Sequence, residues 1–281
     1  MPALTDPPDP SRISVRLAAT PAELHAAQRL RYRVFYEEGG AIADSAAVTE
    51  QRDFDAFDDT TEHLIVVDAA LAAAGLDCGV VGNYRLLRSD TPQARPRFYS
   101  ARAYDLSRLQ DSDARLLELG RSCVRQDYRS RPVLQLLWKA LAEYVADHRV
   151  DVMFGCASFR GTDVDAIAEP LAYLHYHHLA QPAMRPHAVG VNRVAMDRMH
   201  ANEIVPARAL RGMEPLIRGY LRLGAGVGLG ASIDLQFNSI DVCIVLPTAH
   251  LTSKYARRYA RDSQSRLRAP SARAEAVDGL A

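Results

Sequence analysis

The sequence predicts a mixed α/β fold in which one sheet is flanked by helices. Along the chain, strand-like runs are interspersed with amphipathic helical segments. The strand-like runs are short and either alternate in polarity or are strongly apolar. The resulting order is a strand, a helix, three strands, a helix, a strand, a helix and a terminal hairpin. In addition, 48% of the 281 residues are hydrophobic, which is enough to build a sizeable core.

The N-terminal part supplies the first strand, the first helix and an acidic loop. Residues 13–17 alternate in polarity and predict a short strand. Three residues predict the start of the helix that follows. Thr20 can cap it, Pro21 suits its first position, and Glu23 completes a capping box with Thr20. The helix is expected to end near a pair of glycines. Residues 52–59 then form a loop that mixes acidic and aromatic side chains.

The remaining elements follow from periodicity and from turn residues. Residues 89–112 contain two prolines among polar residues and are expected to be irregular, and Pro170 is expected to kink or split its helix. We expect strands at 63–68, 79–87, 116–125 and 151–157, helices at 132–148, 163–178 and 215–223, a hairpin of 232–237 with 240–246, and a basic helix at about 250–262.

Composition limits the domain organisation and the classes of function. We expect disordered ends at 1–11 and 263–281 around one domain, 12–262, which includes the hairpin as a C-terminal extension. The 34 basic and 34 acidic residues balance, which argues against a nucleic-acid partner. Four widely spaced cysteines argue against a disulfide framework or a structural zinc site. We see no signal-peptide core and no apolar run of about 18 residues, so we expect a cytoplasmic protein.

A strand, a basic loop and a helix follow one another within residues 116–139. The first turn of a helix presents free backbone N–H groups and the positive end of its dipole, which together bind phosphate well. Arg125, Arg129 and Arg131 add positive charge beside it, and Ser130 belongs to the same loop. The segment therefore predicts a cradle for a pantetheine phosphate or a pyrophosphate. The alternative is a loop whose arginines are only solvated.

Two charged residues, Glu118 and Arg121, interrupt the apolar strand at 116–125. A charge inside a core strand is costly unless it is paired or functional. Glu118 is therefore a candidate general base for an attacking amine, and the alternative is a buried ion pair with Arg121 or Arg85. In a regular strand Glu118 and Arg121 would point to opposite faces, but Gly120 between them would permit a bulge.

A second group of candidates lies in the N-terminal half. Arg31 and Phe35 are four residues apart on the predicted helix and share one face. Asp55 and Asp58 lie in the acidic loop, and Arg85 lies in the strand at 79–87. Taken singly, each of these residues is explained equally well as part of a salt bridge or as a surface group.

Other patterns carry less weight. Cys156 has no identifiable histidine and acid partners, and a cysteine in an apolar strand is usually a core residue. His175 and His178 share a helix face but His177 diverges, so we expect no metal site. The glycine-rich residues 224–230 do not fit a nucleotide-binding motif and predict a turn before the hairpin.

The order and spacing of seven of these residues resemble the signature of acyl-homoserine-lactone synthases, namely Arg31, Phe35, Asp55, Asp58, Arg85, Glu118 and Arg121. Those enzymes have the acetyltransferase-like (GNAT) fold and take acyl groups from acyl carrier protein. The chain departs from them where Gly39, Gly40 and Ala41 stand in place of a tryptophan after the helical aromatic residue.

A closer resemblance, to the bacterial L-ornithine N-acyltransferases, covers about residues 20–260. It is carried by LRYRVFYEEGGA, RDFDAFD, VVGNYRLL, LELGRSCVRQDYRS, GCASFRGTD, PLIRGYLRLGA and DLQFNSIDVCIVLP. That family performs the first step of ornithine-lipid synthesis. The resemblance implies a GNAT-like, largely antiparallel twisted sheet flanked by helices, a 3-hydroxyacyl group on acyl carrier protein as donor, L-ornithine as acceptor and lyso-ornithine lipid as product.

With this family in view, we expect direct attack of the amine on the thioester, without an acyl-enzyme and without a metal or a tightly bound cofactor. The acyl carrier protein thioester is the co-substrate, and the inner membrane surface and a second O-acyltransferase are further expected partners. We expect Glu118 and Arg121 to be catalytic, Arg31, Phe35, Asp55, Asp58 and Arg85 to bind substrate, and Arg125, Arg129, Ser130 and Arg131 to bind the phosphopantetheine. Asp55 and Asp58 are the candidates for the acceptor's side-chain ammonium.

Two alternatives to ornithine acylation stay open at this point. One keeps the chemistry but changes the acceptor to another amine or forms a lactone, and a lactone synthase would need an adenosylmethionine pocket. The other is a non-catalytic module that binds lipid or carrier protein. The loop at 125–132 has arginines where the usual GNAT phosphate motif has glycines, which argues against ordinary acetyl-CoA as the donor.

Overall fold

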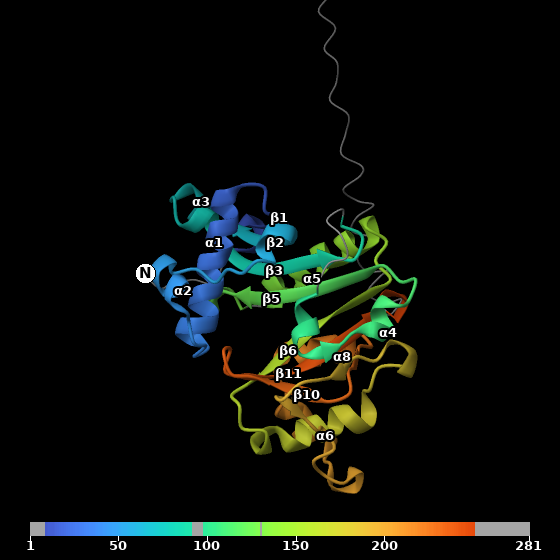
Figure 1. Ribbon diagram of the computed structural model, residues 1–281. Coiled ribbons are helices and arrows are strands. Elements are labelled where there is room, and N and C mark those ends of the chain that lie inside the picture. Colours follow the sequence, from blue (N-terminus) through green and yellow to red (C-terminus); the bar gives the residue numbers. More distant parts are fainter. Residues whose placement is uncertain (1–8, 92–97, 130, 251–281) are drawn as a thin grey trace, which may run out of the picture.

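The computed structural model describes residues 9–91, 98–129 and 131–250 (Figure 1). Within these ranges the main sheet has nine strands, in the order β1-β2-β3-β5-β6-β11-β10-β8, with β9 paired to β11. A small second sheet joins β4 to β7. The strands are β1 (Ile13–Leu17), β2 (Glu62–Asp68), β3 (Val80–Arg88), β4 (Tyr104–Asp105), β5 (Leu116–Val124), β6 (Val152–Arg160), β7 (His187–Ala188), β8 (Arg193–Val194), β9 (Gly226–Val227), β10 (Ala231–Asp234) and β11 (Ser239–Pro247).

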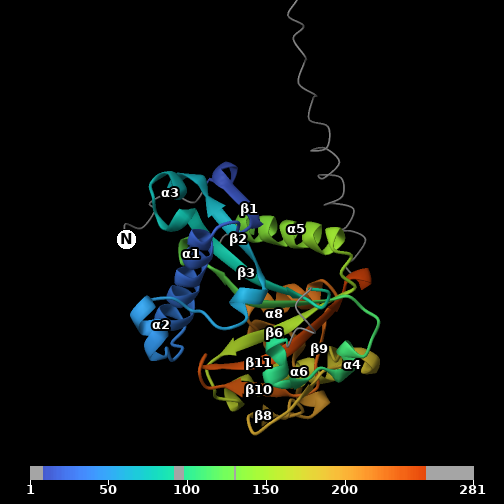
Figure 2. The same cartoon turned by 45° about the horizontal axis from the view of Figure 1, so that its top comes forward.

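Helices cover both faces of this sheet. The alternating side chains of β2 show which helices lie on which face. Leu64 and Val66 face the core cluster to which α5 contributes, whereas Ile65 and Val67 face the cluster of α1. Because successive side chains of a strand point to opposite faces, α1 and α5 lie on opposite sides of the sheet (Figure 2). The helices are α1 (Pro21–Tyr32), α2 (Ser45–Glu50), α3 (Ala69–Ala73), α4 (Ser107–Gln110), α5 (Arg131–Asp147), α6 (Ala168–His177), α7 (Pro206–Arg211) and α8 (Pro215–Arg222).

The strand pairs of the main sheet are antiparallel except for β5 with β6, which run parallel. The predicted mixed, largely antiparallel sheet flanked by helices is therefore confirmed. The predicted start of the first helix is also confirmed, because the Thr20 side chain accepts a hydrogen bond from the Glu23 amide at 3.3 Å. The Glu23 carboxylate in turn accepts the Ala19 amide at 2.8 Å.

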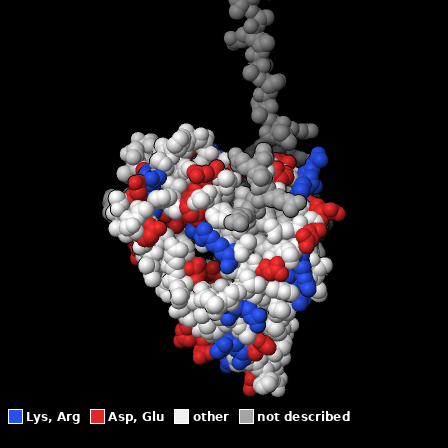
Figure 3. Space-filling view, in the orientation of Figure 1, with Lys and Arg blue, Asp and Glu red and all other residues white. Residues whose placement is uncertain are grey.

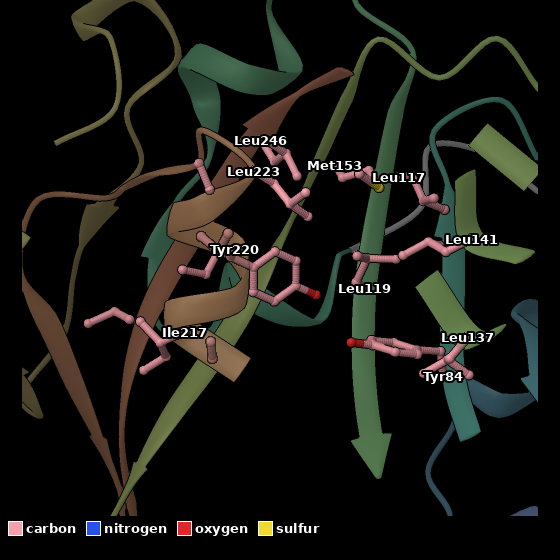
Figure 4. Packing of buried hydrophobic residues seen from close by; sticks show 14 of the residues in the cluster. Tyr84, Leu117, Leu119, Leu137, Leu141, Met153, Ile217, Tyr220, Leu223 and Leu246 are labelled. Atoms are coloured by element: carbon pink, nitrogen blue, oxygen red, sulfur yellow. The ribbon is translucent and has the colours of Figure 1, made fainter. Parts of the chain in front are cut away.

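The largest core cluster joins the two halves of the sheet. Figure 4 shows Tyr84 of β3 and Tyr220 of α8 with their hydroxyl groups directed toward one another near Leu119 of β5. The two tyrosines share a hydrogen bond. Leu137 of α5 and Ile217 of α8 belong to the same cluster. This packing fixes α8 beside the point where β5 and β6 meet.

Some expectations were wrong in detail. The stretch at 89–112 is not irregular throughout, since its described part holds the 3-10 turn Tyr99–Arg102, β4 and α4. The helix expected at 163–178 begins instead at Ala168, after a 3-10 turn, because Asp163 accepts two backbone N–H groups of that turn. Pro170 lies in the first turn of α6, where its missing N–H costs nothing.

The ends of the chain leave two expectations outside the described residues. These are the basic helix at about 250–262 and the disorder at 1–8 and 263–281. Pro10–Arg12 forms a 3-10 turn, so the ordered chain starts before residue 12. In the described ranges, every helix is too short or too polar to cross a lipid bilayer.

Candidate active site

A gap between the parallel strands β5 and β6 forms the centre of the candidate site. The strands pair only where Leu116–Glu118 lies against Val152–Phe154, and no further pair joins them over their described residues. Gly155 follows directly, and a Cβ atom there would lie 2.2 Å from the carbonyl oxygen of Leu119. The strands therefore touch at this glycine and separate beyond it.

The gap opens into a cavity of about 560 Å³ that is lined by residues of both strands and of α5, α8 and the β10–β11 hairpin. Figure 3 shows a hollow on this face of the molecule, with basic and acidic side chains beside one another at its margin. One wall is apolar and is formed by Leu134, Leu137, Trp138, Phe159 and Leu216. The volume is within the range of sites that enclose small organic ligands.

Glu118 lines the cavity from β5 but is only 4% exposed. Its two carboxylate oxygens accept the backbone N–H groups of Tyr99 and Ser100, each at 2.7 Å. Burial raises the pKa of Glu118, and the bonds from Ser100 and Tyr99 oppose this. In the described part of the chain, neither Arg85 nor Arg121 forms an ion pair with Glu118, so the predicted alternative of a buried pair is wrong.

Arg121 lies on the same side of the sheet as the acidic loop. Its guanidinium donates to Asp53 at 3.0 Å and to Asp55 at 3.2 Å. It also lies over the ring of Phe237, 4.5 Å from the centroid, and over that of Tyr99, at 4.7 Å. Burial lowers the pKa of Arg121, but the carboxylates of Asp53 and Asp55 together with Tyr99 raise it, and the net effect is upward, so the group stays charged. The result is a fixed positive charge held between two aromatic rings at the cavity wall.

A bulge in β5 makes this placement of Arg121 possible. Asn83 of β3 pairs with Cys123, whereas Arg85 pairs with Gly120, so two β5 residues stand opposite one β3 residue. Arg121 has a φ of 49°, which is unusual for a residue other than glycine. The bulge that Gly120 was expected to permit therefore falls just after it and changes the direction of Arg121.

A buried ion network lies behind the cavity wall. Arg31 is fully buried and donates to Asp53 at 2.7 Å and to Asp58 at 2.8 Å. Arg85 donates to Asp55 at 2.6 Å and to Asp58 at 3.1 Å. Burial raises the pKa of Asp58, but the hydrogen bonds and charge of Arg31 together with the charge of Arg85 outweigh it and hold the pKa well below its usual range. The network ties α1 to the acidic loop and to β3.

The structure thus joins five of the seven signature residues in one network of ion pairs, and Phe35 and Glu118 stand outside it. Phe35, Arg85, Glu118 and Arg121 line the cavity, whereas the cavity lining does not include Arg31. Asp55 and Asp58 are likewise outside the lining and already pair with arginines. Their predicted contact with a substrate ammonium stays a prediction.

The basic loop after β5 is only partly described. Arg129 lines the cavity, donates to the backbone oxygen of Val124 at 2.8 Å and pairs with Glu38. Arg125 pairs with Asp127 and is not part of the cavity lining. Outside the described residues lie Ser130 and the side chain of Arg131.

Two carboxylates that were not expected from the sequence line the cavity from the β10–β11 hairpin, namely Asp234 and Asp241. Asp241 is 8% exposed, its Oδ1 accepts the Ser239 hydroxyl at 3.0 Å, and it stands opposite Ser158 of β6. Burial raises the pKa of Asp241 to about 6. The signal in the sequence was an acidic residue between Ile240 and Val242 in an otherwise apolar strand.

Comparison with known proteins places the chain in a family. The acetyltransferase (GNAT) domain matches residues 30–139. The chain is 43% identical over 257 residues to the L-ornithine N(alpha)-acyltransferase of Rhodobacter capsulatus, with 92% of this chain and 98% of that protein covered. It is 44% identical over 253 residues to the Brucella abortus protein of the same name, with 89% and 90% covered. The chain belongs to the L-ornithine N(alpha)-acyltransferase family.

Among solved structures, this family member is similar to FeeM, an N-acyl amino acid synthase from uncultured soil microbes, with a TM-score of 0.46 and 13% identity. That comparison covers 84% of this chain and 91% of the other. The CoA-dependent acyl-homoserine lactone synthase BjaI gives a TM-score of 0.46 and 16% identity, covering 92% and 90%.

Membership of the L-ornithine N(alpha)-acyltransferase family confirms two predictions from the sequence. The chain is an acyltransferase, and its fold class is that of the GNAT domain.

Cys156 lies in the cavity wall with its Sγ 3.5 Å from the Ser100 hydroxyl. Burial raises the pKa of its thiol well above the usual value, so Cys156 is a poor nucleophile. Across the described ranges, no group of three or more histidine, cysteine or acidic side chains is arranged to hold a metal ion.

Proposed function

We propose that the chain transfers a fatty acyl group from a thioester donor to the α-amine of L-ornithine. The observation that carries this proposal is the cavity between β5 and β6, whose lining combines a group of apolar side chains with a group of charged side chains. The names of the relatives in the same family support ornithine as the acceptor.

The apolar wall suits the acyl chain. Leu134, Leu137 and Trp138 contribute to it from α5, and Leu216 contributes from α8. Gly219, also in α8, lines the cavity, and an added Cβ there would meet nothing within 4 Å. Burial of methylene groups against such surface stabilises binding by about 0.8 kcal/mol for each group. The wall between α5 and α8 is therefore the place where acyl chain length is selected.

The thioester carbonyl belongs in the gap itself. Beyond Glu118, β5 has no paired neighbour on the β6 side among the described residues, so its backbone N–H groups on that edge are directed at the gap. Such donors stabilise the oxyanion that forms when an amine adds to a thioester. The start of α5 and Arg129 lie at the end of the same strand, where they suit the phosphate of a pantetheine arm.

The charged wall suits an amino acid. Arg121, fixed between two aromatic rings, supplies a positive charge for the α-carboxylate. Asp234 and Asp241 supply negative charge opposite the gap for an ammonium group. A substrate with one carboxylate and two ammonium groups matches this arrangement of charges, and ornithine is such a substrate.

The finer predictions also belong to this proposal. The donor is an acyl group on acyl carrier protein, with a 3-hydroxyl group, and the product is lyso-ornithine lipid. Their support is the family resemblance together with the loop after β5, which lacks the glycines of the usual GNAT phosphate motif. Contacts with the inner membrane surface and with a second O-acyltransferase stay predictions.

The test is an assay of the purified full chain with 3-hydroxyacyl carrier protein or the matching acyl-CoA, and with a panel of free amino acids, followed by mass spectrometry. We expect acylated ornithine, with the carrier protein preferred as donor. Acylation of a different amino acid alone would overturn the acceptor, and no product from either donor would favour the binding module. Stabilisation by adenosylmethionine in a thermal-shift assay would point to lactone formation instead.

A further inference from the structure

Asp241 is a buried carboxylate in the cavity wall with no cation beside it. In the described part of the chain, no arginine, lysine or histidine forms an ion pair with Asp241 or with its neighbour Asp234, although Arg121 is near enough to lower the pKa of Asp241. The hydrogen-bond partners of Asp241 are the hydroxyl groups of Ser158 and Ser239. A hydroxyl can rotate to support either the charged or the neutral carboxyl.

Glu118 is also buried, but its hydrogen-bond donors are backbone N–H groups and not hydroxyl groups. Each of its oxygens accepts a backbone N–H at 2.7 Å, from Tyr99 and Ser100, and these bonds hold the 3-10 turn Tyr99–Arg102 against β5. Adding a proton to Glu118 would weaken two charge-assisted hydrogen bonds and loosen that turn. Glu118 is thus better suited to positioning the cavity wall than to taking up a proton in every turnover.

Glu118 and Asp241 flank the same stretch of β6. Glu118 pairs with Phe154, Asp241 pairs with Ser158, and Cys156 lies between these two β6 residues and lines the cavity. Asp241 is therefore close enough to the gap between β5 and β6 to act on a nucleophile that enters there.

We propose that Asp241, and not Glu118, is the carboxylate that accepts the proton of the attacking ammonium group. The step rests on the acyl transfer proposed above. Asp241 takes one proton from the ammonium, and the freed nitrogen lone pair forms the C–N bond at the thioester carbonyl carbon. The C–S bond then breaks, the departing sulfur takes a second proton from the nitrogen, and Asp241 releases its proton to water. The products are the amide, the thiol and one proton.

The charges around Asp241 favour this role. Asp234 on β10 raises its pKa and Arg121 on β5 lowers it, with burial as the larger cause of the upward shift to about 6. Cys156 on β6, Cys243 on β11 and Tyr104 on β4 also lie within electrostatic reach, and the pKa of each is raised, so all three stay neutral. A base with a pKa slightly below the working pH is ionised and still accepts a proton readily.

The test measures kcat and kcat/KM for acylation of L-ornithine from pH 5 to 8 in the wild type and three variants. We expect the wild type to lose activity on the acid side with an apparent pKa of about 6. Asp241→Asn lowers kcat by about 100-fold or more and removes this acid limb. Glu118→Gln lowers activity less and keeps the limb, and Asp147→Asn, at an exposed site on α5, behaves as the wild type. An acid limb that survives in Asp241→Asn, or that disappears in Glu118→Gln, would overturn the proposal.

Two further measurements test the role of Asp241 independently. They remain informative if Asp241→Asn does not fold or if the acceptor is not ornithine. Asp234→Asn removes a nearby negative charge, so the acid limb should move to lower pH, and an unmoved limb contradicts the role of Asp241. Carbon-13 NMR difference spectra between the wild type and Asp241→Asn follow the Asp241 carboxyl directly, without turnover. A midpoint near 6 supports the proposal, and one below 4 overturns it, whichever amine the enzyme acylates. If another amine replaces ornithine, only the proposed acceptor fails, and the same pH series is run with that amine.

Discussion

A methyl group on Gly155 would lie 2.2 Å from the carbonyl oxygen of Leu119. Gly155 also has a φ of 153°, so both space and backbone conformation favour glycine there. The contact lies directly after the last β5–β6 pair and directly before the cavity. One backbone contact therefore determines where the parallel strands stop pairing and where the gap opens.

Replacing Gly155 by alanine should destabilise the fold and reduce acyl transfer. The added carbon cannot be accommodated without moving the β5 backbone, which we expect to cost about 1–3 kcal/mol. Chemical denaturation measures the stability, and the acylation assay measures the activity. Gly219→Ala is the control, since its added carbon meets nothing within 4 Å in α8. Equal behaviour of the two variants would contradict the role given to Gly155.

A larger side chain at Gly219 should change which acyl chains are accepted. Gly219 lines the apolar wall of the cavity, so a leucine there would fill space that we assign to the end of the acyl chain. We expect kcat/KM for long acyl donors to fall about 10-fold or more, while short donors keep near-normal values. The assay uses donors of increasing chain length with Gly219→Leu and Gly219→Ala. A uniform loss at all lengths would mean that the acyl chain lies elsewhere.

Arg129 and Arg125 should differ in their effect on the thioester donor. Arg129 lines the cavity, whereas Arg125 pairs with Asp127 away from it. Loss of one charge-assisted bond to a phosphate costs about 1.5–3 kcal/mol, so we expect Arg129→Gln to raise the KM for the donor about 10-fold. Arg125→Gln should raise it much less. A larger increase in the KM with Arg125→Gln than with Arg129→Gln would mean that Arg125, and not Arg129, binds the phosphate.

His63 should make the stability of the fold depend on pH. Its ring is buried beside Asp58, its Nδ1 has no hydrogen-bond partner, and burial together with the charge of Arg31 lowers its pKa to about 4. Because the folded pKa is below the unfolded value, His63 contributes its full stability above pH 6.5 and loses it as the pH falls toward 4. Lowering the pKa of His63 from 6.5 to about 4 corresponds to about 3 kcal/mol of folding stability.

The effect of His63 is best measured as a difference between the wild type and His63→Gln. Asp241 acts with the opposite sign, because its raised pKa favours the fold at low pH and disfavours it as the pH rises through about 6. The free energy of unfolding of the wild type should therefore fall more steeply below pH 6.5 than that of His63→Gln. Parallel pH profiles would contradict the assignment.

The sequence predicted the elements with strong local signals. Thr20 and Glu23 fixed the start of α1, and the alternation of apolar residues placed β5 and α5 within one or two residues of their ends. The split of the helix at 163–178 was not resolved, because Asp163 caps a 3-10 turn as readily as a helix. Short elements such as β4 depend on pairing with distant residues and carry little local signal.

The residues of the candidate site also differ in how strongly the local sequence indicates them. Glu118 and Arg121 were visible because charges inside an apolar strand are costly. Asp53 and Asp241 were overlooked, although Asp241 interrupts β11 in the same manner. The partners of Arg31 could not be read from spacing, since they come from a loop more than twenty residues away. Which charges face a cavity and which face each other is decided by tertiary packing.

The most direct test of the central claim is tandem mass spectrometry of the product formed from L-ornithine and an acyl thioester by the purified chain. We expect a single amide on the α-nitrogen, with the side-chain amine left free. We also expect the yield to fall with Asp241→Asn and with Gly155→Ala. Acylation of the side-chain nitrogen, or no acylated ornithine from either the carrier-protein or the CoA donor, would contradict the central claim.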